Sequence, residues 1–170
     1  MSDTPEMIIR LAEPADASAL ARLRYEFRAG HDTACEAEAD FLARCGAWMA
    51  ARLAGGSHWR CWVMEEADRL VGVIWLQLIE KVPNPGAEAE KHGYISNLYV
   101  SPARRGAGLG SRLMDACLRF CEEEAVDAVI LWPTPRSRRL YEKHGFAVRE
   151  DLLERRGSPD ELPPSIQKLL

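Results

Sequence analysis

The sequence predicts one domain of the mixed α/β class. Its 170 residues are close to the length of one average domain, and its 47% hydrophobic and 28% charged residues are typical of a globular protein. Apolar residues recur with the two-residue period of strands in some segments and with the helical period in others. We therefore expect strands and helices around one core at about 8–150, followed by a charged, proline-rich segment at 151–170.

The first strand is expected at 7–12, and two helices follow it. Pro14 and Asp16 favour a helix start, because proline fits the first helical turn and aspartate can cap it. The apolar stripe of this helix is formed by Leu20, Leu23 and Phe27. The second helix is predicted to begin at the capping-box sequence 33–36 and to end at the glycine pair 55–56, with a stripe formed by Phe41, Leu42, Cys45, Met49 and Leu53.

The middle of the chain has the pattern of strands. Segments 59–65 and 70–81 are rich in Val, Ile and Trp and flank a turn around 67–69, which predicts a hairpin. A loop at 83–86, with two prolines and a glycine, separates this hairpin from a strand at 94–100.

The remaining elements follow a glycine-rich turn. A helix runs from this turn to about Glu124. The next strand, 126–132, is apolar enough to be buried on both faces. Two prolines end it, a short helix is expected at 136–144, and short strands are expected at 146–148 and 166–170.

Charge and hydropathy exclude several classes of function. The net charge is −4 and no basic face stands out, so the chain is not expected to bind nucleic acid. No stretch approaches the roughly 20 apolar residues that span a bilayer, and the N-terminus lacks the positive and apolar segments of a signal peptide. We therefore expect a cytoplasmic protein with no membrane partner.

The cysteines and histidines do not form a recognisable ligand set. The five cysteines include no C-x-x-C pair and the four histidines have no H-E-x-x-H spacing, so neither a disulfide framework nor a metal site is expected. Cys117 and Cys121 stand one helical turn apart and are interpreted as two buried thiols on a helix.

The segment 104–110, R-R-G-A-G-L-G, is the pattern that points to chemistry. Its alternate glycines let the backbone approach a ligand closely and point N–H groups at one place. The start of the following helix adds unpaired amides and a partial positive charge. These features predict a site for phosphate or pyrophosphate, to which Arg104 and Arg105 could add charge. The alternative is a turn that binds nothing.

Two common phosphate-binding loops do not match this segment. A P-loop requires a lysine after its last glycine, and none is present here. A dinucleotide-binding G-x-G-x-x-G starting at Gly106 would need glycine where Ser111 stands.

Three stretches of the sequence resemble one known family. Arg105-x-x-Gly108-x-Gly110 resembles the (Q/R)-x-x-G-x-(G/A) motif of the GNAT superfamily of acyl-CoA-dependent N-acetyltransferases. The segment 98–102 resembles the exit of that family's fourth strand, and 140–146 resembles its L-Y-x-x-x-G-F segment, about 30 residues after the first motif. The predicted order of elements agrees with this family over most of the chain.

The resemblance implies a fold and a site for a co-substrate. The family's fold is a central, largely antiparallel sheet in which strands four and five splay apart, flanked by about four helices. Acetyl-CoA lies between the splayed strands. In this chain the implied acetyl-CoA-binding residues are Leu98, Tyr99, Val100, Arg105, Gly106, Ala107, Gly108, Leu109, Gly110, Ser111, Thr134, Ser137 and Tyr141.

The resemblance also implies particular roles. The backbone of 98–100 would pair with the pantetheine arm, with the N–H of Leu98 directed at the thioester carbonyl. Backbone amides of 105–111 would hold the pyrophosphate. Tyr141 would stand near the sulfur and protonate the departing thiolate. The alternative for Tyr141 is that it only packs in the core.

At two positions the chain departs from the family pattern. Tyr94 stands where some members carry a glutamate base, so the base is left open: a water chain, a carboxylate such as Glu80, or no base for an amine of low pKa. Thr134 stands where an asparagine often contacts pantetheine, whereas Ser137 keeps the usual small side chain.

Several charged runs have ordinary interpretations. The segment 122–124 is interpreted as a solvated helix end. His31 and Asp32 lie between the first two helices, where this family builds its acceptor pocket, and could contact the acceptor. A solvated helix face, with contact to the 3′-phosphate of CoA as the alternative, is expected for Arg136, Arg138 and Arg139.

The resemblance implies an N-acetyltransferase that moves an acetyl group from acetyl-CoA to a primary amine by direct transfer in a ternary complex. Its partners would be acetyl-CoA and an acceptor amine on a small molecule, a protein N-terminus or a lysine, and such proteins are often homodimers. Two alternatives remain: a catalytically silent acyl-CoA-binding or sensing module, and a nucleotide-binding oxidoreductase that uses the glycine-rich turn.

Overall fold

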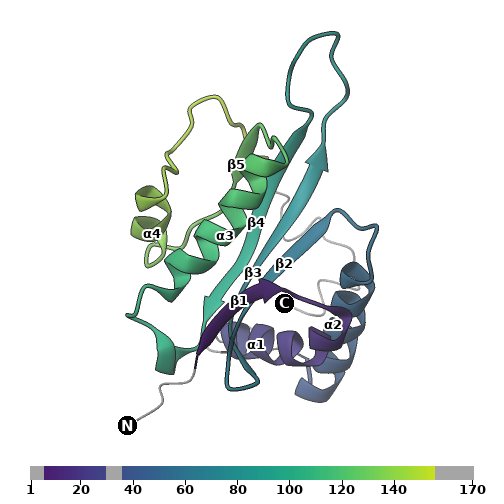
Figure 1. Ribbon diagram of the computed structural model, residues 1–170, viewed down its shortest axis with the longest axis vertical. Helices are drawn as coiled ribbons and strands as arrows, with labels where there is room; N and C mark the ends of the chain where they lie inside the picture. The colour runs from purple at the N-terminus through teal and green to yellow at the C-terminus, as the bar shows by residue number, and fades with distance from the viewer. Residues whose placement is uncertain (1–5, 30–35, 156–170) are drawn as a thin grey trace.

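A computed structural model describes residues 6–29 and 36–155 (Figure 1). Its centre is a five-stranded sheet in the order β1-β2-β3-β4-β5. The first four strands pair antiparallel, and β5 lies parallel to β4. The expected mixed, largely antiparallel sheet is therefore confirmed. The strands are β1 (Met7–Leu11), β2 (Trp59–Glu66), β3 (Arg69–Glu80), β4 (Lys91–Val100) and β5 (Ala128–Ile130).

Helices cover both faces of the sheet. On one face lie α1 and α2, and on the other lie α3 and α4 (Figure 1). Their bounds are α1 (Ala17–Ala29), α2 (Glu38–Leu53), α3 (Leu109–Glu123) and α4 (Arg138–Lys143), with 3-10 turns at Pro14–Asp16 and Pro102–Arg104. Among the helices of the described residues, none has the length and apolar character to cross a membrane.

The sheet separates two layers of buried side chains because successive residues of a strand point to opposite faces. On the α3 side, Leu113, Met114 and Cys117 are fully buried against β3. On the α1 side, Leu20 and Ala21 are fully buried in the same way. The expectation of two buried thiols on α3 is confirmed, since Cys117 and Cys121 are 0% and 4% exposed.

The second helix begins later than its capping-box sequence predicted. Of the segment 33–36, the structure describes only Glu36, which bonds Arg44 at 2.6 Å instead of closing a helix start. Ala37 is extended, and α2 begins at Glu38. Glu36 thus precedes the helix instead of standing in its first turn, and its carboxylate bonds a side chain of α2 and not a backbone amide at the helix start.

Two expectations about the later strands were wrong. The strand expected at 126–132 spans only Ala128–Ile130, and it is an edge strand with an exposed Ala128. The expected strand at 146–148 is irregular, and Val148 is 76% exposed. Among the described residues, no strand pairs with β5 on the side away from β4, and none pairs with 146–148. An apolar run in the sequence cannot indicate by itself whether a second strand will lie beside it. The strand expected at 166–170 lies outside the described residues.

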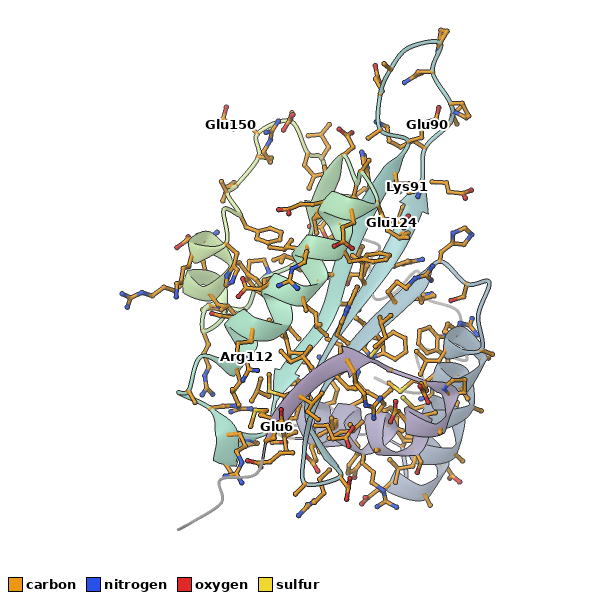
Figure 2. All side chains as sticks on the ribbon, in the orientation of Figure 1. Glu6, Glu90, Lys91, Arg112, Glu124 and Glu150 are labelled. Carbon is orange, nitrogen blue, oxygen red and sulfur yellow. The ribbon has the colours of Figure 1, made fainter. Side chains whose placement is uncertain are left out.

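At the far end of α3, acidic residues face solvent as expected. Residues 122–124 are exposed. The Nζ atom of Lys91 donates to Glu124 Oε2 at 2.9 Å, and Figure 2 shows these two side chains meeting between β4 and the end of α3. This ion pair ties the start of β4 to the helix that covers it.

Candidate functional site

β4 and β5 separate halfway along β4. Their parallel pairing runs from His92↔Ala128 to Tyr94↔Ile130 and ends there. β4 continues to Val100, with no strand beside it on this edge among the described residues. A wedge therefore opens between the second half of β4 and the chain that follows β5.

A β-bulge lies in β4 at the level of this wedge. The pairs Val73↔Tyr99 and Trp75↔Ser96 leave Asn97 and Leu98 opposite the single residue Ile74. Asn97 adopts φ +56°, a left-handed conformation that asparagine tolerates better than most residues. A bulge bends a strand and increases its twist. The backbone of Leu98 therefore lies at a bend in β4.

The side chains of residues 98–100 of β4 point alternately to the two faces of the sheet. Leu98 and Val100 pack against the α3-side core, which also contains Leu109 and Tyr141. Tyr99 faces α1, with its ring centre 5.3 Å from that of Phe27. The structure thus brings four of the predicted site residues into one cluster on the α3 side of the wedge.

The glycine-rich loop leads from β4 into α3. Gly106 and Gly108 have φ +89° and +72°, and a Cβ atom on either would meet no atom beyond its chain neighbours within 4 Å. Gly108 is the N-cap of α3, and the first helical hydrogen bond runs from Arg112 N to Gly108 O at 3.2 Å. The amides of 109–111 precede that bond, and neither a capping side chain nor an acidic residue occupies the first turn.

These features fit a bound polyanion. The space beside the two left-handed glycines is open, and the helix start presents amides and partial positive charge. Gly110 differs from the other two glycines, because its φ is not positive and a Cβ atom there would make an ordinary contact, 3.5 Å from Leu140 Cδ2. The packing of α4 against α3 would therefore accept alanine at this position.

The two arginines of the loop contribute unequally. Arg104 Nε donates to Glu66 Oε2 at 2.6 Å, so its charge is balanced within the protein. Arg105 Nε donates to the carbonyl of Val100 at 2.9 Å, and its guanidinium lies 5.5 Å from the centre of the Tyr99 ring. Arg105 therefore fastens the loop to the end of β4.

Tyr141 lies on α4 at the edge of the core. It is 9% exposed, and its ring meets Phe146 nearly edge to face at 5.9 Å. Burial raises the pKa of Tyr141 above its usual value near 10, and a hydrogen bond with Ser137 acts in the opposite direction. The phenol is therefore neutral, and able to donate a proton, across the neutral pH range.

Thr134 and Ser137 bond mainly to each other. The amide of Thr134 donates to Ser137 Oγ at 3.0 Å, and the two hydroxyl oxygens are 2.9 Å apart. The amide of Ser137 in turn lies 3.3 Å from Thr134 Oγ1. This reciprocal pattern shapes the turn before α4. The contact of both residues with CoA stays a prediction.

Neither residue considered in connection with the base places a carboxylate near the bulge. Glu80 pairs with Lys91 at the far end of the β3–β4 ladder. At about 3.4 Å per residue this is roughly 20 Å from Leu98, too far for direct action. Tyr94 packs edge to face on Trp132, with ring centres 5.1 Å apart.

The remaining candidates are three arginines near α4 and two residues between α1 and α2. Arg136, Arg138 and Arg139 are exposed, as a solvated face requires, and Arg138 lies 3.9 Å from Glu142. Their contact with a CoA phosphate stays a prediction. His31 and Asp32 lie outside the described residues.

A cavity on the α1/α2 side of the bulge was missed by the sequence interpretation. Its volume is about 310 Å³. Arg24 was a possible signal, because it stands four residues after Leu20 and three before Phe27, on the apolar stripe of α1. The lining residues are Arg24, Phe41, Arg44, Cys45, Trp48, Met49, Trp59, Trp75, Ser96 and Asn97.

A larger cavity, of about 540 Å³, lies elsewhere. It is bounded by β1 and α3, and its rim carries Arg112, Asp115 and Arg119. Figure 2 shows Arg112 reaching toward the start of β1, where its Nη2 donates to Met7 O at 3.4 Å. Because β1 is the edge strand opposite β5, this cavity is remote from the wedge.

Known proteins resemble this chain in sequence and in fold. A glucosamine 6-phosphate N-acetyltransferase of Trypanosoma brucei brucei is 34% identical over 87 residues, which are 51% of this chain and 56% of that protein. This chain thus matches about half the length of that curated relative. An acetyltransferase structure from the same species, Trypanosoma brucei, is 25% identical with a TM-score of 0.66, over 89% of this chain and 99% of that one.

Two further solved structures share the fold. A GCN5-related N-acetyltransferase from Ralstonia eutropha JMP134 is 28% identical with a TM-score of 0.72, over 88% of this chain and 98% of that one. A predicted acetyltransferase with acetyl-CoA from Clostridium acetobutylicum is 24% identical with a TM-score of 0.72, over 89% of this chain and 96% of that one. The sequence pattern of the acetyltransferase (GNAT) family matches residues 21–146. On this match the chain belongs to the GNAT family of acetyltransferases.

Proposed function

We propose that this protein transfers an acetyl group from acetyl-CoA to a primary amine by direct attack in a ternary complex. The observation that carries the proposal is the separation of β4 and β5 beyond Tyr94, with the bulge of β4 in the wedge and an uncapped helix start at its end. The Clostridium acetobutylicum relative with acetyl-CoA and the Trypanosoma brucei brucei N-acetyltransferase support the same reaction.

The wedge and the loop suit the parts of acetyl-CoA. No strand lies beside 98–100 on this edge among the described residues, and its backbone groups, apart from the Val100 carbonyl bonded to Arg105, are offered to the amides of the pantetheine arm. The amides of 105–111 suit the pyrophosphate. When bound, acetyl-CoA supplies an acetyl group activated as a thioester.

Two groups of the chain would assist the transfer. The N–H of Leu98, at the bulge, would stabilise the negative charge that develops on the thioester oxygen. Tyr141 would hold a proton for the departing thiolate, and its raised pKa keeps that proton in place at neutral pH. Both groups belong to elements whose side chains share the α3-side core.

The acceptor amine would enter from the cavity beside the bulge, since Ser96 and Asn97 of β4 line it. No Asp or Glu is found among the described residues lining this cavity. We therefore assign deprotonation of the amine to water, or to the amine's own low pKa, and not to a side-chain base.

The test is an assay of free thiol with purified protein, acetyl-CoA and a panel of primary amines. Release of CoA thiol that depends on both protein and amine is expected. The lack of a carboxylate base at Tyr94 favours a second candidate, a silent acyl-CoA-binding module. Calorimetric binding of CoA without turnover on any amine would support that candidate, and a preference for NAD over CoA would contradict both.

A further inference from the structure

Aromatic rings form most of the apolar wall of the cavity beside the bulge. The centres of the Trp48 and Trp59 rings are 5.2 Å apart, and that of Trp75 lies 5.8 Å from Trp48. Phe41 completes this wall from α2. Flat apolar rings pack well against such surfaces, edge to face or offset.

Arg24 brings a positive charge to this cavity. Its Nη1 donates to Asn97 Oδ1 at 3.1 Å, and burial lowers the pKa of its guanidinium, which stays charged at neutral pH. In the described part of the chain, no carboxylate forms an ion pair with it. Arg44, on the same cavity, differs because Glu36 lies 2.6 Å from it.

Trp75 contributes its ring to the cavity wall. Its side chain is 2% exposed, and its indole Nε1 is buried without a hydrogen-bond partner among the described residues. Because this nitrogen is not accessible from the cavity, Trp75 presents an apolar surface to a ligand.

We propose that the acceptor of this enzyme is a small amine that carries both an aromatic ring and a carboxylate, the chemistry of an aromatic α-amino acid. The inference rests on the proposed acetyltransferase function and names its acceptor class. The ring packs on the indoles, and the carboxylate pairs with Arg24. The volume of about 310 Å³ suits a molecule of this size, and the cationic lining disfavours polyamines.

The test compares two amines that differ by one carboxylate, L-phenylalanine and 2-phenylethylamine. The unaltered protein should acetylate phenylalanine with the higher kcat/KM. Arg24→Gln should lower kcat/KM for phenylalanine about 10- to 100-fold and change that for phenylethylamine less than about threefold, as loss of a charge-assisted pair predicts. Arg22→Gln, on the exposed side of the same helix, is the matched control and should alter neither value.

Other results would overturn the inference. If Arg24 only supports Asn97 and the bulge, Arg24→Gln would lower kcat/KM for phenylalanine and for phenylethylamine by the same factor. Turnover of spermidine or glucosamine 6-phosphate, with none of phenylalanine, would contradict the acceptor class while leaving the acetyltransferase function in place.

A binding measurement decides the case in which no amine is acetylated. The intrinsic fluorescence of the cavity tryptophans should change and saturate with 3-phenylpropionate, and the change should be lost in Arg24→Gln. With turnover absent and this response present, the proposed function fails and the cavity assignment stands. With no response in the unaltered protein, the cavity assignment fails.

Discussion

Tyr141 combines a structural and a proposed chemical role in one side chain. Its ring closes the α3-side core against Phe146, while its hydroxyl carries the proton assigned to the leaving thiolate. Burial raises its pKa, so the protonated form is favoured in the folded protein at pH values where a free tyrosine would begin to ionise. The same shift implies that stability falls as pH rises through the folded-state pKa.

The variant Tyr141→Phe keeps the ring and removes the hydroxyl. Turnover should fall about 100-fold or more, as loss of a general acid predicts, while the Kd for CoA stays nearly unchanged. Thiol release and calorimetry measure the two quantities. Tyr25→Phe, on the opposite face of the sheet, is the control. Unchanged turnover in Tyr141→Phe would show that Tyr141 only packs in the core.

The start of α3 depends on a residue that can adopt a left-handed conformation. Gly108 has φ +72° with open space beside it. Any residue with a side chain is strained there, and an acidic one also brings negative charge to the helix end. Strain and charge can therefore be separated by two substitutions at one position.

Gly108→Glu should weaken CoA binding by at least about 100-fold, because its carboxylate would lie in the space assigned to the phosphates. Gly108→Ala introduces the same backbone strain, about 1–2 kcal/mol of stability, without the charge, and should bind CoA more tightly than the Glu variant. Calorimetric titration with CoA measures both. Equal affinities for the two variants would mean that phosphate does not bind at this loop.

The turn between β2 and β3 is a second element with left-handed residues. Ala67 and Asp68 have φ +48° and +60°, and Glu66 pairs with Arg69. This is a two-residue turn of the type that favours Asn-Gly. The hairpin itself was predicted from its strands, but the sequence A-D does not indicate this turn type.

Replacing this turn by Asn-Gly should stabilise the protein. The double variant Ala67→Asn and Asp68→Gly should raise the free energy of unfolding by about 1 kcal/mol, because the strained residues are removed. Urea denaturation measures the change, and acetyltransfer should be unaffected. A lower urea midpoint for the double variant would show that Ala67 or Asp68 makes a contact that stabilises the protein by more than the backbone strain destabilises it.

For the whole molecule, Arg10 joins three separate segments. Its guanidinium bonds Asp16 at 2.8 and 2.9 Å and Glu65 at 2.7 Å, which links β1, the 3-10 turn before α1 and β2. The hydrogen bond from Arg10 is the main reason that the pKa of Asp16 is lowered from its usual value near 3.8. This contribution to stability is present above that usual value and is lost as pH falls below it.

The variant Asp16→Asn should therefore lose about 1–2 kcal/mol of unfolding free energy at pH 7, and less below about pH 4. Thermal unfolding across this pH range measures the difference. Asp151→Asn is an instructive control: Arg149 lies 2.7 Å from Asp151 and lowers its pKa to about 2, but both side chains are exposed, so little change is expected. The Arg10 and Asp16 side chains are only 35% and 13% exposed, so an equal loss of stability in both variants would contradict the expectation that partial burial strengthens their ion pair.

Patterns within short stretches of the sequence were enough to predict most of the fold. The stripes of α1 and α3, the β2–β3 hairpin and the glycine-rich loop are each specified by neighbouring residues, whose spacing decides which side chains share a face. The motifs at Arg105–Gly110 and 140–146 were enough to indicate the family, because each motif is contiguous.

Contacts between distant residues decided the rest. The bulge at Asn97 depends on its pairing with β3, and the length of β5 depends on its pairing with β4. The cavity proposed for the acceptor combines Arg24 of α1 with tryptophans of α2, β2 and β3. Arg24 and Trp75 are 51 positions apart in the sequence. Sequence alone determined most local elements and indicated the family; the wedge and the charged cavity beside it arose only when packing brought these segments together.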